Sequence, residues 1–209
     1  EENFWQLNEE ESEGLTTTEL RNKENANRYK WIEYHKWKFK SDWYTQIVEK
    51  LVLRTNIEYG YLGSYSKSLG DSPFESFQLG GDGMSGFNYY YGTDVVPLRG
   101  YDGGNGRGSL TVFPQANVYS KYVLELRYPL TLNPSATIYA MIFADAGNTW
   151  NSIDEIDPFN CYRSAGVGLR FWLPRFGLLG VDWGYGFDPV YGQPGANKGK
   201  FAFTIGQQF

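Results

Sequence analysis

Cysteine, histidine and long apolar runs are scarce in this sequence of 209 residues. The single cysteine, Cys161, excludes a disulfide within the chain and a cysteine-based zinc site. The single histidine, His35, lies between Tyr34 and Lys36 without a recognisable nucleophile motif, so we expect no catalytic triad. No stretch of about 18 uninterrupted apolar residues occurs, which argues against a membrane-spanning helix.

The charge balance is mildly acidic, with 19 basic and 24 acidic residues and a pI near 5.0. Nucleic-acid-binding proteins usually carry a basic stripe, so we expect no nucleic-acid partner. The acidic residues of segment 9–13 lack the spaced Asp, Asn and Gly of a calcium loop. The glycine-rich segment 100–108 lacks the flanking strand and helix of a phosphate-binding loop. We therefore expect neither a metal nor a cofactor.

Aromatic residues and glycine are abundant: aromatics make up 18% of the chain, and glycine accounts for 25 residues. Many segments alternate between apolar residues and small or polar residues, which is the period of a β-strand. Around Trp183, for example, Val181 and Tyr185 share its parity, whereas Asp182 and Gly184 occupy the other. The alternation predicts about seven strands within residues 28–39, 43–61, 121–128, 137–147, 164–171, 176–187 and 200–209.

The connections between these predicted strands are of two kinds, short turns and long polar segments, as in an outer-membrane β-barrel. A soluble β-sandwich is the alternative, since its strands also alternate. The second face of a sandwich is normally covered with Lys, Glu and Asp, whereas here that parity is largely Gly, Ala, Ser and isolated charges. The pattern favours an all-β, antiparallel transmembrane barrel. Because about seven strands do not close a barrel, either residues 3–8 add a strand or upstream strands are missing, and we favour the second.

One basic residue, Arg99, lies deep within the longest predicted connection, residues 80–120. Glu125 and Asp145 lie in the two predicted strands that follow it. A charge inside a barrel is costly unless it is paired, and a guanidinium can donate forked hydrogen bonds to carboxylates. Two hypotheses are open: a loop tip folded inward, where Arg99 binds both acids, or an exposed loop arginine.

Five segments resemble, in the same order, those of the BamA family, the barrel subunits of the machinery that assembles outer-membrane proteins. They are FESFQLGGDG at 74–83, LRGY at 98–101, LELRYP at 124–129, FADAGNTW at 143–150 and FAFTIGQQF at 201–209. Each segment alone is a weak signal, but the ordered set is specific. The resemblance implies the C-terminal part of a sixteen-stranded barrel, with about seven strands here and further strands and periplasmic POTRA domains upstream.

The resemblance also divides the chain into regions. Residues 1–27 are then an external loop and the end of a preceding strand, and residues 28–209 are barrel strands with the sixth external loop at 80–120. The motif of that loop, written VRGF in the family, corresponds here to Leu98, Arg99, Gly100 and Tyr101. The resemblance assigns Arg99 to the barrel lumen, with the acids at 125 and 145 as its partners.

The last predicted strand resembles a β-signal, the aromatic-ended motif by which barrel proteins are recognised. In the BamA family this strand also forms one side of a lateral seam in the barrel wall. The resemblance therefore implies a seam and signal made by Gly199, Phe201, Phe203, Ile205, Gly206 and Phe209.

The function implied is that of an insertase in the bacterial outer membrane, which folds and inserts β-barrel proteins through the seam and performs no bond chemistry. Its implied partners are nascent outer-membrane β-barrel proteins, accessory lipoproteins, and outer-membrane lipid and lipopolysaccharide. The alternatives are a two-partner secretion or autotransporter-assembly transporter, a passive porin, and a barrel enzyme that would need a nucleophile beside His35.

Overall fold

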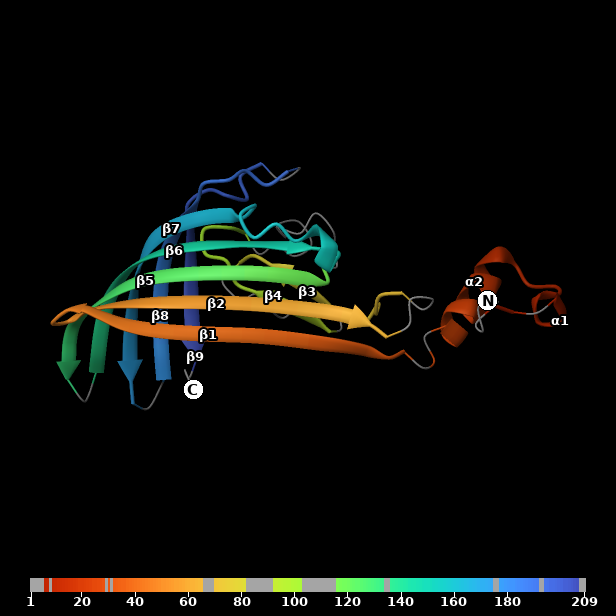
Figure 1. Ribbon diagram of the computed structural model, residues 1–209, viewed down its shortest axis with the longest axis horizontal. Coiled ribbons are helices and arrows are strands. Elements are labelled where there is room, and N and C mark those ends of the chain that lie inside the picture. The colour runs from red at the N-terminus through yellow and green to blue at the C-terminus, as the bar shows by residue number, and fades with distance from the viewer. Residues whose placement is uncertain are drawn as a thin grey trace. The chain divides into compact units, whose positions relative to one another are not determined.

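A computed structural model describes residues 6–7, 9–28, 30, 32–65, 70–81, 92–102, 116–133, 136–174, 177–191 and 194–206, without the side chains of residues 9 and 10. Its elements (Figure 1) are α1 Glu9–Ser12, α2 Thr17–Arg28, β1 Tyr34–Val48, β2 Leu51–Ser64, β3 Ser76–Leu79, β4 Thr93–Val96, β5 Val118–Asn133, β6 Ala136–Trp150, η1 Ile153–Glu155, β7 Tyr162–Leu173, β8 Gly177–Gly186 and β9 Lys200–Gly206.

The chain divides into two compact units, of which the first comprises residues 1–36 and 62–73. Helix α2 begins at a capping box, in which the Thr16 backbone N–H donates to Glu19 Oε2 at 2.9 Å and the Glu19 N–H donates to Thr16 Oγ1 at 3.4 Å. Residues 9–12 and 17–28 are thus helical, which the alternation did not predict, and the assignment of 1–27 to an external loop and the end of a strand stays a prediction. Among the described residues, no helix has both the length and the apolar character needed to cross a bilayer.

The second unit comprises residues 37–61 and 74–209 and contains most of a strongly curved, seven-stranded sheet (Figure 1). The strand order is β1-β2-β5-β6-β7-β8-β9, so neighbours in the sheet are also neighbours in the chain apart from β3 and β4. Each pair from β2–β5 to β8–β9 is antiparallel. The predicted antiparallel β fold and the predicted number of strands in the sheet are confirmed.

The first two strands differ from their predicted bounds. A single strand was expected over 43–61, but β1 ends at Val48 and β2 begins at Leu51 after a two-residue turn. The Gln46 side chain closes this turn by donating to the Glu49 carbonyl at 2.5 Å. The turn contains neither Gly nor Pro, and Ile47 and Leu51 keep the same parity across it, so the alternation continues as if the strand were unbroken.

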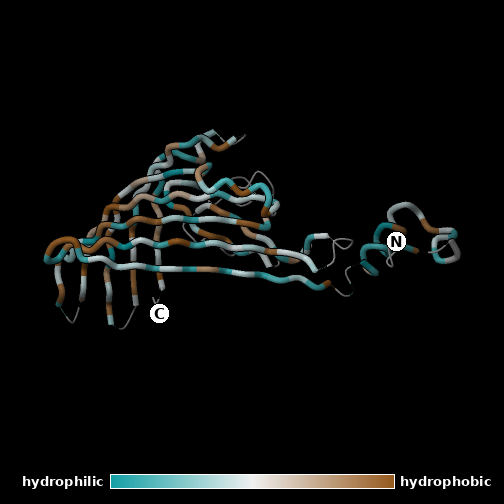
Figure 2. Tube along the Cα trace, in the orientation of Figure 1, coloured by the Kyte–Doolittle hydropathy of each residue, from teal (hydrophilic) through white to brown (hydrophobic). Residues whose placement is uncertain are grey.

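The sheet inverts the usual distribution of apolar and charged residues. On β8, Trp183 and Tyr185 are exposed, whereas Asp182 is 1% exposed. On β9, Phe201 is 69% exposed and Ala202 is 7% exposed. Figure 2 shows apolar and polar residues interleaved along the strands in this way. An extended apolar face opposite a face of buried charges is typical of a sheet that contacts lipid on one side and surrounds a polar interior on the other.

Candidate functional site

The connection between β2 and β5 runs from residue 65 to 117. It begins earlier than the predicted loop 80–120. It contains the parallel strand pair β3–β4. Phe77 and Leu79 of β3 are fully buried, and just beyond them the Leu98 N–H donates to the Gly81 carbonyl at 3.1 Å. Leu98 is itself 0% exposed, so the loop is anchored on the residue immediately before Arg99.

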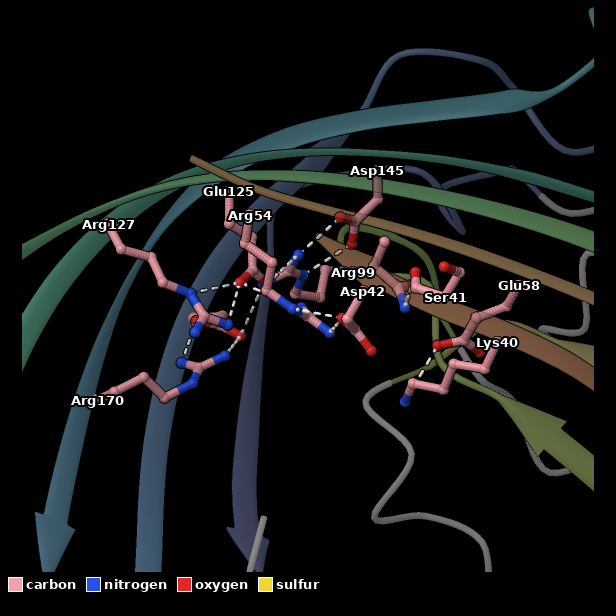
Figure 3. A network of polar contacts seen from close by, with 12 residues as sticks. Lys40, Ser41, Asp42, Arg54, Glu58, Arg99, Glu125, Arg127, Asp145 and Arg170 are labelled. Carbon is pink, nitrogen blue, oxygen red and sulfur yellow. Dashed lines mark hydrogen bonds and ion pairs between the residues drawn. The ribbon is translucent and has the colours of Figure 1, made fainter. Parts of the chain in front are cut away.

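Arg99 lies among carboxylates from three strands of the sheet (Figure 3). Its Nε donates to Asp145 Oδ2 at 2.7 Å and its Nη2 to Asp145 Oδ1 at 2.6 Å, which makes a forked pair. The same Nη2 lies 3.1 Å from Glu125 Oε1, and Nη1 lies 3.6 Å from Asp182 Oδ2. The guanidinium also stacks on the Phe143 ring at 3.6 Å from its centroid.

Glu125 is shared among three arginines. In addition to Arg99, it accepts from Arg127 Nε at 2.9 Å and lies 3.2 Å from Arg54 Nη1. Arg54 in turn donates from Nε to Asp42 Oδ1 on β1 at 2.8 Å. One carboxylate on β5 therefore connects the loop to β2 and, through Arg54, to β1.

Asp182 on β8 is the centre of a second buried pair. Arg170 of β7 donates from Nη1 to Asp182 Oδ1 at 2.5 Å and from Nη2 to Oδ2 at 2.6 Å. The resulting ionic cluster has four cations and four anions, namely Arg54, Arg99, Arg127, Arg170, Asp42, Glu125, Asp145 and Asp182. Buried charges are stable only when each has its partner, so removing one member leaves the others uncompensated.

The charge state of Arg99 follows from the same contacts. Burial alone would lower the pKa of Arg99, but the carboxylate of Asp145 and, to a lesser degree, those of Glu125 and Asp182 outweigh this effect. The pKa of Arg99 is raised as a result, and the loop carries a permanent cation. A cavity of about 370 Å³ adjoins the cluster, and its lining includes the buried Lys121.

Gly100 and Tyr101 fix the loop against the ends of β7 and β8. Gly100 has φ +84°, and a Cβ built on it would lie 2.9 Å from the Gly186 backbone nitrogen. Both the left-handed backbone conformation and this close contact therefore disfavour any side chain at position 100. The Tyr101 hydroxyl donates to the Arg163 carbonyl at 2.7 Å and accepts from the Asp188 N–H at 3.2 Å. Burial raises the pKa of Tyr101 to about 12.

The structure thus brings Leu98, Arg99, Gly100 and Tyr101 onto the inner face of the sheet, with Arg99 bound to Glu125 and Asp145 instead of solvent. The predicted seam residues lie elsewhere, on β9 and just before it, with Phe201, Phe203 and Ile205 exposed. Phe209 lies outside the described residues. The functional roles of both sets stay predictions.

Five members of the ionic cluster were not predicted: Asp42, Arg54, Arg127, Arg170 and Asp182. The signal that identifies them is a lone charge on the small or polar parity of a strand, as with Asp182 between Gly180 and Gly184. That signal shows which face a charge occupies, but the partner depends on strand register.

Comparisons with known proteins agree with this architecture. The chain is similar to the crystal structure of BamA from Haemophilus ducreyi lacking POTRA domains 1–3, with a TM-score of 0.53 and 20% identity over 85% of this chain and 35% of that chain. At this identity the likeness shows the fold alone, and it confirms a BamA-like barrel sheet. No curated protein sequence matches the chain. The model of the Omp85 superfamily domain matches residues 18–209, and the chain therefore belongs to the Omp85 superfamily.

Proposed function

We propose that this chain forms seven strands of a bacterial outer-membrane barrel that folds and inserts other β-barrel proteins. Membership of the Omp85 superfamily and the lipid-facing sheet support an outer-membrane location and a role in protein insertion or transport. The observation that carries insertion is the state of β9. In the described part of the chain β9 has 7 residues against 10 in β8 and 15 in β6, so fewer backbone hydrogen bonds hold it to its neighbour.

A short strand beside a seam can template another strand where the seam opens. Its outer edge presents backbone N–H and C=O groups to any chain that approaches in extended form. Gly199 precedes β9 and Gly206 ends it, and glycine weakens a strand and permits bending. Each unpaired backbone group in hydrocarbon costs several kcal/mol, so an edge that opens has a strong tendency to accept a new partner.

The ionic cluster supports the same proposal from the interior side. A seam that opens within a barrel wall requires that the remaining strands keep their arrangement. Arg99 binds acids on β5, β6 and β8, and these strands are thereby connected through the loop as well as through the sheet. We propose that this loop keeps the wall next to the seam in place while β9 exchanges partners.

The partners in this proposal are nascent outer-membrane β-barrel proteins, accessory lipoproteins, and outer-membrane lipid with lipopolysaccharide. We propose no bond chemistry for the chain. Its single histidine, His35, lies at the start of β1 with its ring centroid 4.9 Å from that of Tyr65. Labelling by a serine-directed covalent probe that depends on His35 would contradict this part of the proposal.

The test is disulfide capture during client folding, with the full-length protein in liposomes and Cys161 replaced by serine. Thr204→Cys on β9 is expected to form an adduct with a cysteine in the terminal strand of an unfolded barrel client, and the client is expected to become protease-resistant in the bilayer. Val167→Cys is the matched control, because β7 is paired on both sides.

Two outcomes would favour other functions. A client recovered in the vesicle lumen instead of the bilayer would indicate a secretion transporter. Ion conductance without any adduct at position 204 would indicate a passive channel.

A further inference from the structure

The loop that contains Arg99 also contacts β9, through the residue that follows Tyr101. Asp102 accepts a hydrogen bond from Lys200 Nζ at 2.7 Å, and Lys200 is the first residue of β9. The Asp102 backbone N–H donates to the Ala196 carbonyl at 2.9 Å. Asp102 is therefore hydrogen-bonded to both ends of segment 196–200, which leads into β9.

These contacts differ in kind from those of Arg99. The Lys200 side chain is 32% exposed and that of Asp102 is 55% exposed, whereas the carboxylate partners of Arg99 are buried. Exposed ion pairs contribute little to stability and break readily. The backbone bond to Ala196, a residue only 6% exposed, gives the exposed pair a fixed geometry. The loop thus has a strong anchor at Arg99 and a weak contact at Asp102.

The weak contact lies where β9 starts to pair. Lys200 faces Gly184 at one end of the β8–β9 register, and the opposite end is Gly206 facing Leu178. Strands separate first at their ends, because the terminal pairs have the fewest neighbours. A bond from the loop to Lys200 therefore acts on the pair at which separation of β9 from β8 begins.

We propose that Asp102 and Lys200 are positioning residues that couple the docked loop to the pairing of β9. While the loop is docked, the ion pair between Asp102 and Lys200 keeps the start of β9 hydrogen-bonded to β8. When this ion pair breaks, the start of β9 is free to change partners. The proposal rests on the proposed function only in that β9 borders the seam, since the coupling itself is a property of this chain.

Hydrogen–deuterium exchange of the full-length protein in lipid, without any client, tests the coupling. Asp102→Asn and Lys200→Gln are each expected to speed amide exchange in peptides covering 196–206 by about two- to five-fold, the effect of losing one exposed ion pair. Asp102→Glu is expected to restore slow exchange, and so is the charge exchange Asp102→Lys with Lys200→Asp. Lys198→Gln removes the same charge nearby and is expected to leave exchange unchanged.

Unchanged exchange in both single variants would overturn the proposal, and so would an equal effect of Lys198→Gln or a failure of both rescues. Heat-modifiable migration on gels confirms that each variant is folded. Client insertion is measured separately. Altered exchange in the variants, with no client insertion by the wild type, would contradict the proposed function and leave the coupling intact. Client insertion by the wild type, with unaltered exchange in the variants, would contradict the coupling and leave the proposed function intact.

Discussion

The guanidinium of Arg99 lies 3.6 Å from the centroid of the Phe143 ring, and Phe143 precedes Asp145 on the same face of β6. One strand therefore supplies both the aromatic contact and the forked ion pair of the loop arginine. A desolvated cation over an aromatic face contributes about 0.5–2 kcal/mol.

Replacing that ring isolates its contribution. Phe143→Leu keeps an apolar side chain but removes the π face, so we expect the docked loop to be destabilised by about 0.5–2 kcal/mol. The measurement is the rate at which proteinase K cleaves within residues 92–102 of the folded protein. Phe187→Leu, on the exposed face, is the control; equal cleavage rates in the two variants would contradict the role of the ring.

Removing Arg99 has a larger expected effect. Arg99→Ala leaves the buried Asp145 without its arginine partner and removes one of the three arginines around Glu125, and breaking such a buried pair typically costs about 3–5 kcal/mol. We expect the protein to reach the membrane, with rapid proteolysis of the loop, a lower melting temperature and reduced client insertion. Arg163→Ala breaks the exposed pair with Asp188 and is expected to cost only about 0–1 kcal/mol. Similar melting temperatures for the two variants would count against the buried cluster.

The loop also depends on the absence of a side chain at Gly184. A Cβ at this position would lie 2.9 Å from the Gly100 backbone nitrogen, so backbone has to move. We expect Gly184→Ala to displace the loop and to raise its protease sensitivity. Gly206→Ala is the matched control, because a Cβ there meets nothing within 4 Å. Loop cleavage that is the same in both variants would show that the close approach is unimportant.

Tyr101 predicts a dependence on alkaline pH. Burial raises the pKa of Tyr101 to about 12, whereas the pKa of an unfolded tyrosine is about 10. Because the folded pKa is the higher one, the neutral phenol stabilises the fold below about pH 10, and that contribution is lost as the pH rises from about 10 towards 12. The melting temperatures of wild type and Tyr101→Phe are therefore expected to converge over this range, and parallel curves would refute the assignment.

On β9 we expect the effect of an added charge to depend on which face of the strand carries it. Phe203 is 52% exposed on the apolar face and pairs with Val181 near the middle of the strand. A lysine there is expected to cost about 2–4 kcal/mol if the face contacts hydrocarbon, and to impair insertion of the chain itself. Thr204→Lys, on the opposite face that lines the cavity, is expected to be tolerated. Normal heat-modifiable migration of the Phe203→Lys protein would exclude a lipid-facing surface.

Most of the sheet could be predicted from alternation alone. Residues 176–187 were expected to form a strand and β8 spans Gly177–Gly186, because the exposed apolar parity is unbroken there. The first strands were placed wrongly, since the turn at 49–50 preserves parity. Helix α2 was missed because its capping box lies in a region where the resemblance gave no guidance.

The site was predictable to the extent that charge pairing reveals it. Charge pairing alone left an inward and an exposed Arg99 equally open, and the resemblance to the BamA family assigned Arg99 to the lumen with Glu125 and Asp145 as its partners. The remaining members depend on register: Arg54 lies directly opposite Glu125, whereas Arg170 is opposite Gly180 and reaches Asp182 diagonally. A single sequence gives the face of each strand but not its alignment with the next.

The contacts of the loop join residues far apart in the sequence, which has a consequence for the order of folding. Arg99 reaches 46 residues ahead to Asp145, the Tyr101 hydroxyl 62 residues to Arg163, and Asp102 as far as 98 residues to Lys200. Closing such long segments is entropically costly until the strands between them have formed. Docking of the loop is therefore a late event in the folding of this chain, completed only after β9 has been synthesised and paired with β8.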